Sequence, residues 1–277
     1  FIVIFSSLLI FSLYVLKNNY SLPDIHSYFD LFEDSKSVSF SEIAKLQKFR
    51  WYYKYEYAWC LYAKILSSIT EYKEIIVAVS GLCVIIGYMT FIMKYSKNVT
   101  FSILLFMVMF FYNSSFVLRQ NMAVALCLIA TVFLLEGKKK CFVLFVLLAT
   151  SIHNSAIVYL LMYWLHSKKI DLRYVLFYMS AVLCLYLVSS KLVMGAILFS
   201  SYRGYAEIMN EGMQENFANA TPFLIYSFVL LFVLWSMKSK KFDGVNLLCV
   251  QSLFVVCAIN LIRLGMLGTV GRLSLYF

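Results

Sequence analysis

Two ionisable residues, Arg119 and His153, lie inside otherwise apolar segments and are the first candidates for chemistry. An ionisable group inside hydrocarbon costs between ~2.5 and 10 kcal/mol or more, so such groups usually face a polar cavity and act there. Arginine suits a diphosphate, because its planar guanidinium can bond to two oxygens at once and stays protonated. Histidine suits the removal of a proton from a hydroxyl near neutral pH. We therefore predict a site in the segment from Asn113 to Leu165.

Each of these two residues also has a purely structural explanation. Arg119 can extend its side chain to the outer headgroups, and His153 can break a helix and bond to a backbone carbonyl. At the start of a helix a cation meets the positive end of the helix dipole, at a cost of ~0.3 to 1 kcal/mol. An anionic group beside Arg119 would offset that cost. For both Arg119 and His153, the sequence is compatible with a structural role and with a chemical role.

The composition places these residues in a membrane protein. Of the 277 residues, 62% are hydrophobic and 14% are charged, and the mean hydropathy is +0.82. A soluble domain of this size could not bury so many apolar side chains. Several runs reach the ~17 to 25 residues that a transmembrane helix needs, without the alternation of barrel strands. We predict an all-α polytopic membrane protein, a bundle of about 8–9 transmembrane helices.

The basic residues gather in short clusters between the apolar runs and so indicate topology. The net charge of +10 is also compatible with nucleic-acid binding. Lysine clusters in short turns between spans, however, mark the cytoplasmic side of a membrane. We therefore predict no nucleic-acid partner. The clusters are Lys94 with Lys97, Lys138 to Lys140, Lys168 with Lys169, and Lys238 to Lys241.

Two polar segments, residues 17–74 and 200–220, are predicted to be loops on the outer face. The first carries equal numbers of basic and acidic residues and the second is acidic, so neither fits the positive bias of cytoplasmic loops. Within the first, Ser39 and Glu42 have capping-box spacing and predict the start of an amphipathic helix. The aromatic cluster from Trp51 to Trp59 is typical of the headgroup level, with stacking on sugars as the alternative.

The apolar segment from Cys141 to Leu165 poses a topological problem. As one span it would put the basic residues that follow it outside and the acidic 200–220 loop inside. A break at Ser151 to Ser155, giving two half-length helices that enter and leave on the cytoplasmic side, removes both conflicts. Irregular backbone at membrane depth needs protein or a water-filled cavity around it. We therefore predict a re-entrant-like helix pair near His153, whose second half offers amides at Asn154 or Ser155 to an anion.

The expected organisation is a single membrane domain over residues 1–277. Both ends lie in apolar runs that look clipped, so we expect a chain truncated at both ends. The seven cysteines form no CxxC pair and predict neither a disulfide nor a metal site. There is also no P-loop, GxGxxG, HExxH or GxSxG motif, so nucleotide, zinc or serine hydrolase chemistry has no support and no cofactor is predicted.

The central segment resembles the EpsG-like family of exopolysaccharide polymerases, within the broader Wzy-type oligosaccharide repeat-unit polymerases. That family shows an Arg-Gln pair opening a membrane helix, a lysine-rich turn, and an aromatic residue followed by His, any residue, Ser or Thr, and Ala. The matching residues are Arg119-Gln120, Lys138 to Lys140 and Ile152-His153-Asn154-Ser155-Ala156, with Ile152 in place of the aromatic residue. Weaker matches are Asp24 with Tyr28 and Phe32, Glu56 with Tyr57, and Arg272 followed by Tyr276 and Phe277.

The resemblance implies a glycosyltransferase of the multi-span (GT-C-like) type, multi-pass in the bacterial cytoplasmic (inner) membrane. Such an enzyme moves a growing glycan from undecaprenyl diphosphate onto a sugar hydroxyl of another lipid-linked repeat unit. The product is a capsule, O-antigen or exopolysaccharide. The implied partners are undecaprenyl-diphosphate-linked glycans, together with a chain-length regulator and a flippase in the same membrane.

The resemblance also implies roles for individual residues. Arg119, Arg272 and Arg263 would hold the diphosphate, while His153 or Asp24 would take the acceptor proton. Supporting roles are expected for Gln120, Ser155, Tyr28, Glu56, Arg203 and Tyr205. For the last two, contact with sugar and an ordinary interface are both open.

Two other functions fit the same sequence. A transporter or flippase of lipid-linked sugars would also carry buried arginine and broken helices, although it should show internal repeats, which are not evident here. A membrane O-acyltransferase that modifies a polysaccharide would also use a buried histidine, with an acyl donor in place of the diphosphate lipid. Loss of such an activity would remove acetyl groups and leave glycan length intact.

Overall fold

The structure, a computed structural model, is built from helices. It describes residues 2–16, 23–48, 55–115, 117–168, 220–236, 244–264 and 276–277, with isolated positions between 170 and 184. Within those ranges the regular elements are α-helices and 3-10 helices, and no strand occurs. The prediction of an all-α protein is therefore confirmed for the described part of the chain.

Two helices of the described chain are long and apolar enough to cross a bilayer, α4 (Ile75–Tyr95) and α7 (Leu118–Leu135). The other apolar helical segments are shorter, namely Ile2–Leu16, Val99–Met109, Asn154–Leu165, Pro222–Ser236 and Gly244–Asn260. The prediction of about 8–9 full spans is therefore not confirmed. It counted the apolar run that begins at Val99 as a complete span, whereas α5 (Val99–Met109) ends early. Helix α8 (Lys139–Ile152) is short, as predicted for the first half of the broken pair.

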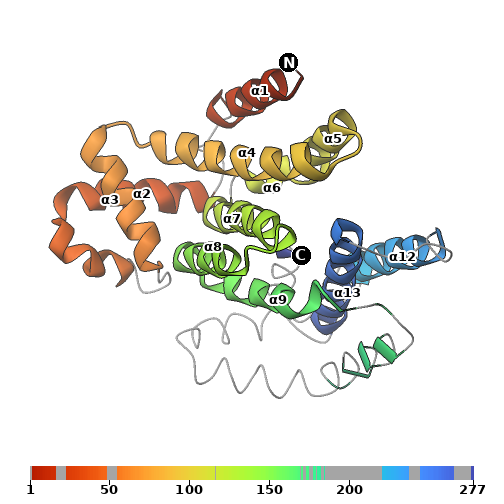
Figure 1. The fold of residues 1–277 in the computed structure, drawn as a ribbon. Helices are drawn as coiled ribbons and strands as arrows, with labels where there is room; N and C mark the ends of the chain where they lie inside the picture. The colour runs from red at the N-terminus through yellow and green to blue at the C-terminus, as the bar shows by residue number, and fades with distance from the viewer. Residues whose placement is uncertain are drawn as a thin grey trace. The chain divides into compact units, whose positions relative to one another are not determined.

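The chain divides into two compact units, residues 1–157 and residues 158–277. The first unit contains α1 (Ile2–Leu16), α2 (Pro23–Ser37), the 3-10 helix η2 (Phe40–Lys48), α3 (Tyr57–Ile69), α4, α5, α6 (Phe111–Ser114), α7 and α8. In it α7 packs against both α8 and α4, and α2 packs against α3 (Figure 1). The predicted single domain and its outer loops stay a prediction.

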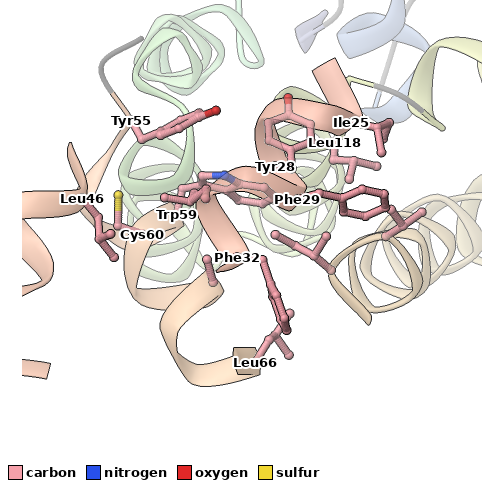
Figure 2. Packing of buried hydrophobic residues seen from close by; sticks show 14 of the residues in the cluster. Ile25, Tyr28, Phe29, Phe32, Leu46, Tyr55, Trp59, Cys60, Leu66 and Leu118 are labelled. Atoms are coloured by element: carbon pink, nitrogen blue, oxygen red, sulfur yellow. The ribbon is translucent and has the colours of Figure 1, made fainter. Parts of the chain in front are cut away.

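The main core of the first unit forms where α2, η2 and α3 meet the ends of α4 and α7. Trp59 is fully buried at its centre and packs edge-on against Tyr28, with ring centroids 5.2 Å apart. Figure 2 shows this cluster, in which Phe32 and Leu66 lie on one side of Trp59 and Tyr55 on the other. Full burial of one large apolar side chain contributes roughly 1.5 to 3 kcal/mol, so this core fixes the polar segment that precedes α4.

Two of the aromatic residues predicted at the headgroup level are packed inside this core. Tyr55 and Trp59 are 1% and 0% exposed, so both belong to the core. Tyr57 is exposed, as an interfacial residue would be. The predicted helix after Ser39 is present as η2, whose Ile43 and Leu46 are buried while most of its other side chains face outward. A loop of mixed charge therefore folds into a packed layer.

The predicted break near His153 is present. Helix α8 ends at Ile152, and His153 has extended backbone, with φ −148° and ψ 109°. The chain continues as the 3-10 helix η3 (Asn154–Leu161) and the short α9 (Met162–Leu165). Since 3-10 hydrogen bonds are poorer than α-helical ones, a 3-10 run of this length often marks a functional or strained segment.

In the second unit α12 (Ala220–Ser236) packs against α13 (Gly244–Leu264). Their shared core contains Leu230, Val250, Phe254 and Cys257. Gln251, which is fully buried, donates from Nε2 to the carbonyl of Lys168, 2.6 Å away. Residues 200–219 of the predicted second outer loop lie outside the described residues.

Helices α4 and α7 approach each other closely at Gly87. A Cβ added there would lie 2.6 Å from Ala125 Cβ and 2.7 Å from the Ala125 carbonyl oxygen. No side chain fits at such distances, so glycine lets the two backbones meet. This contact holds α7, and therefore Arg119 in its first turn, at a fixed distance from α4.

We predict that Gly87→Ala lowers the free energy of unfolding by about 1 to 3 kcal/mol, because the added methyl forces the two backbones apart. Thermal unfolding of the purified protein in detergent would show a lower Tm. Ile86→Val is the matched control, since Ile86 is 50% exposed and the change removes one methyl group without creating a clash. An unchanged Tm for Gly87→Ala would contradict the close contact.

Candidate functional site

A buried carboxylate, Glu56, connects the two residues that the sequence singles out. Arg119 Nη1 donates to Glu56 Oε2 at 2.5 Å. The backbone N–H of Asn154 donates to Glu56 Oε1 at 3.0 Å, and His153 Nδ1 lies 3.3 Å from the same oxygen. The Glu56 side chain is 6% exposed, that of Arg119 17% and that of His153 25%. Glu56, Arg119, His153 and Asn154 form what we call the Glu56 cluster.

Each member of the cluster lies at the end of a helix. Glu56 is the residue before α3, and its carbonyl accepts the backbone N–H groups of Trp59 and Cys60. Arg119 is in the first turn of α7, and His153 is the residue at which α8 stops. Helix ends place these side chains on a rigid scaffold while leaving backbone groups available for bonding.

The guanidinium of Arg119 lies against aromatic side chains. Its Cζ is 4.8 Å from the centroid of the Tyr55 ring, within the range of a cation–π contact. Tyr55 is itself fixed from two sides, because its hydroxyl donates to the carbonyl of Ser27 and its carbonyl accepts a bond from Gln47. Arg119 Nε is buried and has no hydrogen-bond partner among the described residues. The arginine therefore keeps one unused donor.

Burial and neighbouring charges shift the pKa of Glu56 in opposite directions. Burial alone would raise the pKa of its carboxyl, but the contact with His153, the charge of Arg119 and the N–H of Asn154 together outweigh it. The pKa of Glu56 therefore lies below its usual value, and Glu56 is a carboxylate at neutral pH. This carboxylate is the anionic group expected beside Arg119 at a helix start. The same carboxylate accepts the backbone N–H of Asn154, the group that was expected to bind an anion.

The other candidate residues that the structure describes differ in how directly they interact with the Glu56 cluster. Tyr28 is buried, and the charge of Arg119 acts on its hydroxyl. Asp24 is in the first turn of α2 and acts on Tyr28, but forms no hydrogen bond or ion pair with Arg119 or His153. Gln120 is buried in α7, and Ser155 is half-buried in η3. The structure thus joins His153 to Glu56 more directly than to Asp24.

Four predicted residues cannot be located in the site. Arg203, Tyr205 and Arg272 lie outside the described residues. Arg263 is part of α13, but its side chain lies outside the described residues as well. Their predicted roles stay predictions.

The sequence underestimated Glu56 and missed Tyr55. Glu56 was expected only to support the site, and Tyr55 was assigned to the headgroup level with its aromatic neighbours. A carboxylate next to a dense aromatic run, just before an apolar helix, was the available signal. Pairing with partners 63 and 98 residues away in sequence could not be foreseen from local pattern.

Chemically, the Glu56 cluster combines a fixed cation, a carboxylate and a partly exposed imidazole. Such a set can transfer a proton and stabilise negative charge that develops nearby. Among the residues that the structure describes, no group of three or more His, Cys, Asp or Glu side chains is arranged to hold a metal ion.

Comparison with known proteins gives one result. The family model described as the EpsG family matches residues 1–277, the whole chain. No curated protein and no solved structure is significantly similar to it.

The lowered pKa of Glu56 predicts a specific dependence of stability on pH. Because the folded pKa lies below the unfolded value of about 4.3, Glu56 stabilises the fold above that value and loses this contribution as pH falls through the folded pKa. We expect Glu56→Gln to lower Tm at pH 7, and the difference from the unmodified protein to shrink as the pH falls below the unfolded pKa of about 4.3 and through the lower folded pKa. Thermal unfolding across this range tests this expectation, and a difference independent of pH would contradict it.

Proposed function

The chain belongs to the EpsG family, and on this basis we propose that it is a membrane-embedded polysaccharide polymerase. Family membership and the two membrane-capable helices make it an exopolysaccharide-related membrane protein. The proposed activity is glycosyl transfer between undecaprenyl-diphosphate-linked oligosaccharide repeat units. The product would be an exopolysaccharide, a capsule or an O-antigen.

The Glu56 cluster is the observation that carries the proposal. Arg119 and His153 are 34 positions apart in the numbering, yet both contact the same carboxylate. A polymerase of this kind needs a cation for a diphosphate leaving group and a base for an acceptor hydroxyl. The cluster provides a candidate for each within one small region of the first unit.

The proposed reaction breaks one bond and forms one. A hydroxyl oxygen of the acceptor sugar attacks the anomeric carbon of the donor glycan. The bond between that carbon and the diphosphate oxygen breaks, and its electron pair leaves with undecaprenyl diphosphate. The proton of the acceptor hydroxyl passes to His153, and neither water nor a nucleotide is consumed.

In this proposal Arg119 stabilises the charge of the leaving diphosphate. Its positive charge is held in place by Glu56 and Tyr55 before substrate arrives. A donor preorganised in this way costs little reorganisation when charge develops. Arg272 and Arg263 are proposed as further diphosphate ligands, with the supporting residues named above.

The proposed location is the bacterial cytoplasmic membrane, with the site on its outer face. Residues 17–74 carry balanced charge and contain Glu56, whereas Lys138 to Lys140 lie at the opposite end of α7 from Arg119. The positive bias of cytoplasmic turns supports this orientation. The proposed partners are a flippase that delivers lipid-linked units and a chain-length regulator.

We predict that Arg119→Ala or His153→Ala reduces polymerisation at least ~100-fold, in line with loss of a preorganised donor or a base. Gel analysis of glycans from cells making each variant would show single repeat units in place of long polymer. Lys138→Ala is the matched control, because it removes an exposed cation at the far end of α7 and should leave long polymer intact. Immunoblotting of membrane fractions confirms that each variant is present.

Four outcomes separate the proposed activity from its rivals. Lipid-linked single units that accumulate on the outer face support polymerisation. Accumulation on the inner face would indicate transport. Long polymer that lacks acetyl groups would indicate acyl transfer, and unchanged polymer in both variants would overturn the proposal.

A further inference from the structure

We propose that Glu56 is a positioning residue that fixes the imidazole of His153 and the guanidinium of Arg119 with a single carboxylate. The inference rests on the proposed function, in which these two side chains act on the acceptor and the donor. Glu56 would hold the proton of His153 on Nδ1 and leave Nε2 as the basic nitrogen. It would also fix the spacing between base and cation.

The two oxygens of Glu56 divide between the two side chains. Oε2 accepts from Arg119 Nη1 at 2.5 Å, while Oε1 lies 3.3 Å from His153 Nδ1 and accepts from the N–H of Asn154. With each oxygen occupied by a different partner, rotation of the carboxylate would break both contacts together. The positions of base and cation are thereby coupled through Glu56.

The exposure of His153 assigns its two ring nitrogens to different surroundings. Nδ1 is buried and has no well-formed hydrogen bond among the described residues, and Glu56 Oε1 lies 3.3 Å from it. The side chain is nevertheless 25% exposed, and this exposed area must belong to its other atoms. In this proposal Nε2 is the ring nitrogen that meets a substrate hydroxyl, because Nδ1 is buried beside Glu56.

The backbone around His153 is fixed independently of Glu56. Its N–H donates to the carbonyl of Ala149, and its carbonyl accepts from the N–H of Ala156, both at 2.9 Å. The extended φ and ψ of this residue are thus set by α8 and η3. What remains to be set is the ring orientation and tautomer, and the Glu56 carboxylate is placed to do this.

Charge favours the same arrangement. A carboxylate beside Nδ1 stabilises the tautomer that carries its proton there, and it stabilises the imidazolium formed when Nε2 accepts a second proton. An amide in its place can donate to Nδ1 and so favour the opposite tautomer. Glu56→Gln therefore changes the electronic state of His153 while preserving the shape of the side chain.

The first measurement requires no activity. Nitrogen-15 NMR of the histidine side chains in the full chain in detergent would report the tautomer of His153, assigned by the signals missing from His153→Ala. The chain contains three histidines, so assignment by difference is practical. We expect the Nδ1–H form at neutral pH, and a dominant Nε2–H form would overturn the inference.

The second measurement compares Glu56 variants in a polymerisation assay. We expect Glu56→Gln to lower kcat by about 100-fold or more with little change in KM, and to shift His153 toward the Nε2–H form. Glu56→Asp should keep the Nδ1–H form and recover part of kcat, because it retains the carboxylate. Glu71→Gln is the matched control, since Glu71 is 84% exposed, and it should match the unmodified protein.

The outcomes separate this inference from the proposed function. If Arg119→Ala and His153→Ala still make long polymer, the polymerase proposal fails, and the tautomer of His153 still decides whether Glu56 positions it. If those two variants lose polymer but Glu56→Gln keeps both kcat and the Nδ1–H form, the polymerase proposal stands and the positioning role is overturned. A purely structural role would lower the yield of folded protein without changing the tautomer, and that result also counts against the inference.

Discussion

A carboxylate buried in protein must be compensated, and the first unit is arranged around that requirement at Glu56. Glu56 is 7% exposed, and an ion so removed from water is costly unless charged and hydrogen-bonding partners surround it. Its partners come from the start of α7 and from the break after α8. Helix ends that are distant in sequence therefore have to meet at one point. The compensation of a single charge joins three parts of the chain.

The layer formed by α2, η2 and α3 gives this meeting point its rigidity. Trp59 lies one helical turn beyond Glu56 and is fully buried, so the start of α3 cannot move without disturbing the core. Tyr55, on the other side of Glu56, is held by bonds to Ser27 and Gln47 and supports the guanidinium of Arg119. Apolar packing thus fixes the position of the Glu56 carboxylate. The bond from the Asn154 N–H to that carboxylate in turn stabilises the break in the backbone at His153.

Local sequence patterns predicted the helices better than the contacts between the helices. Hydropathy indicated a helical membrane protein. The expected positive charge of cytoplasmic loops located the break near His153 to within a few residues. The number of spans was harder to predict, because an apolar run does not reveal where a helix ends inside it, and two helices of the described chain are long enough to cross a bilayer. Glu56 lay in a polar segment where carboxylates are usually solvated, so its burial depended on tertiary pairing. The sequence therefore identified Arg119 and His153, while their common partner emerged only from the fold.

The close approach at Gly87 carries a consequence for how this family can diverge. Because the Ala125 backbone and methyl group fill the space where a Cβ at residue 87 would lie, the two positions share one small volume. The Cα and carbonyl oxygen of residue 125 stay there whatever its side chain, so any side chain at residue 87 requires a shift of α7 that would carry Arg119 with it. In relatives that keep this packing, residue 87 should therefore stay glycine. That constraint would be the signature of a distant site exerting selection on a contact where no chemistry occurs.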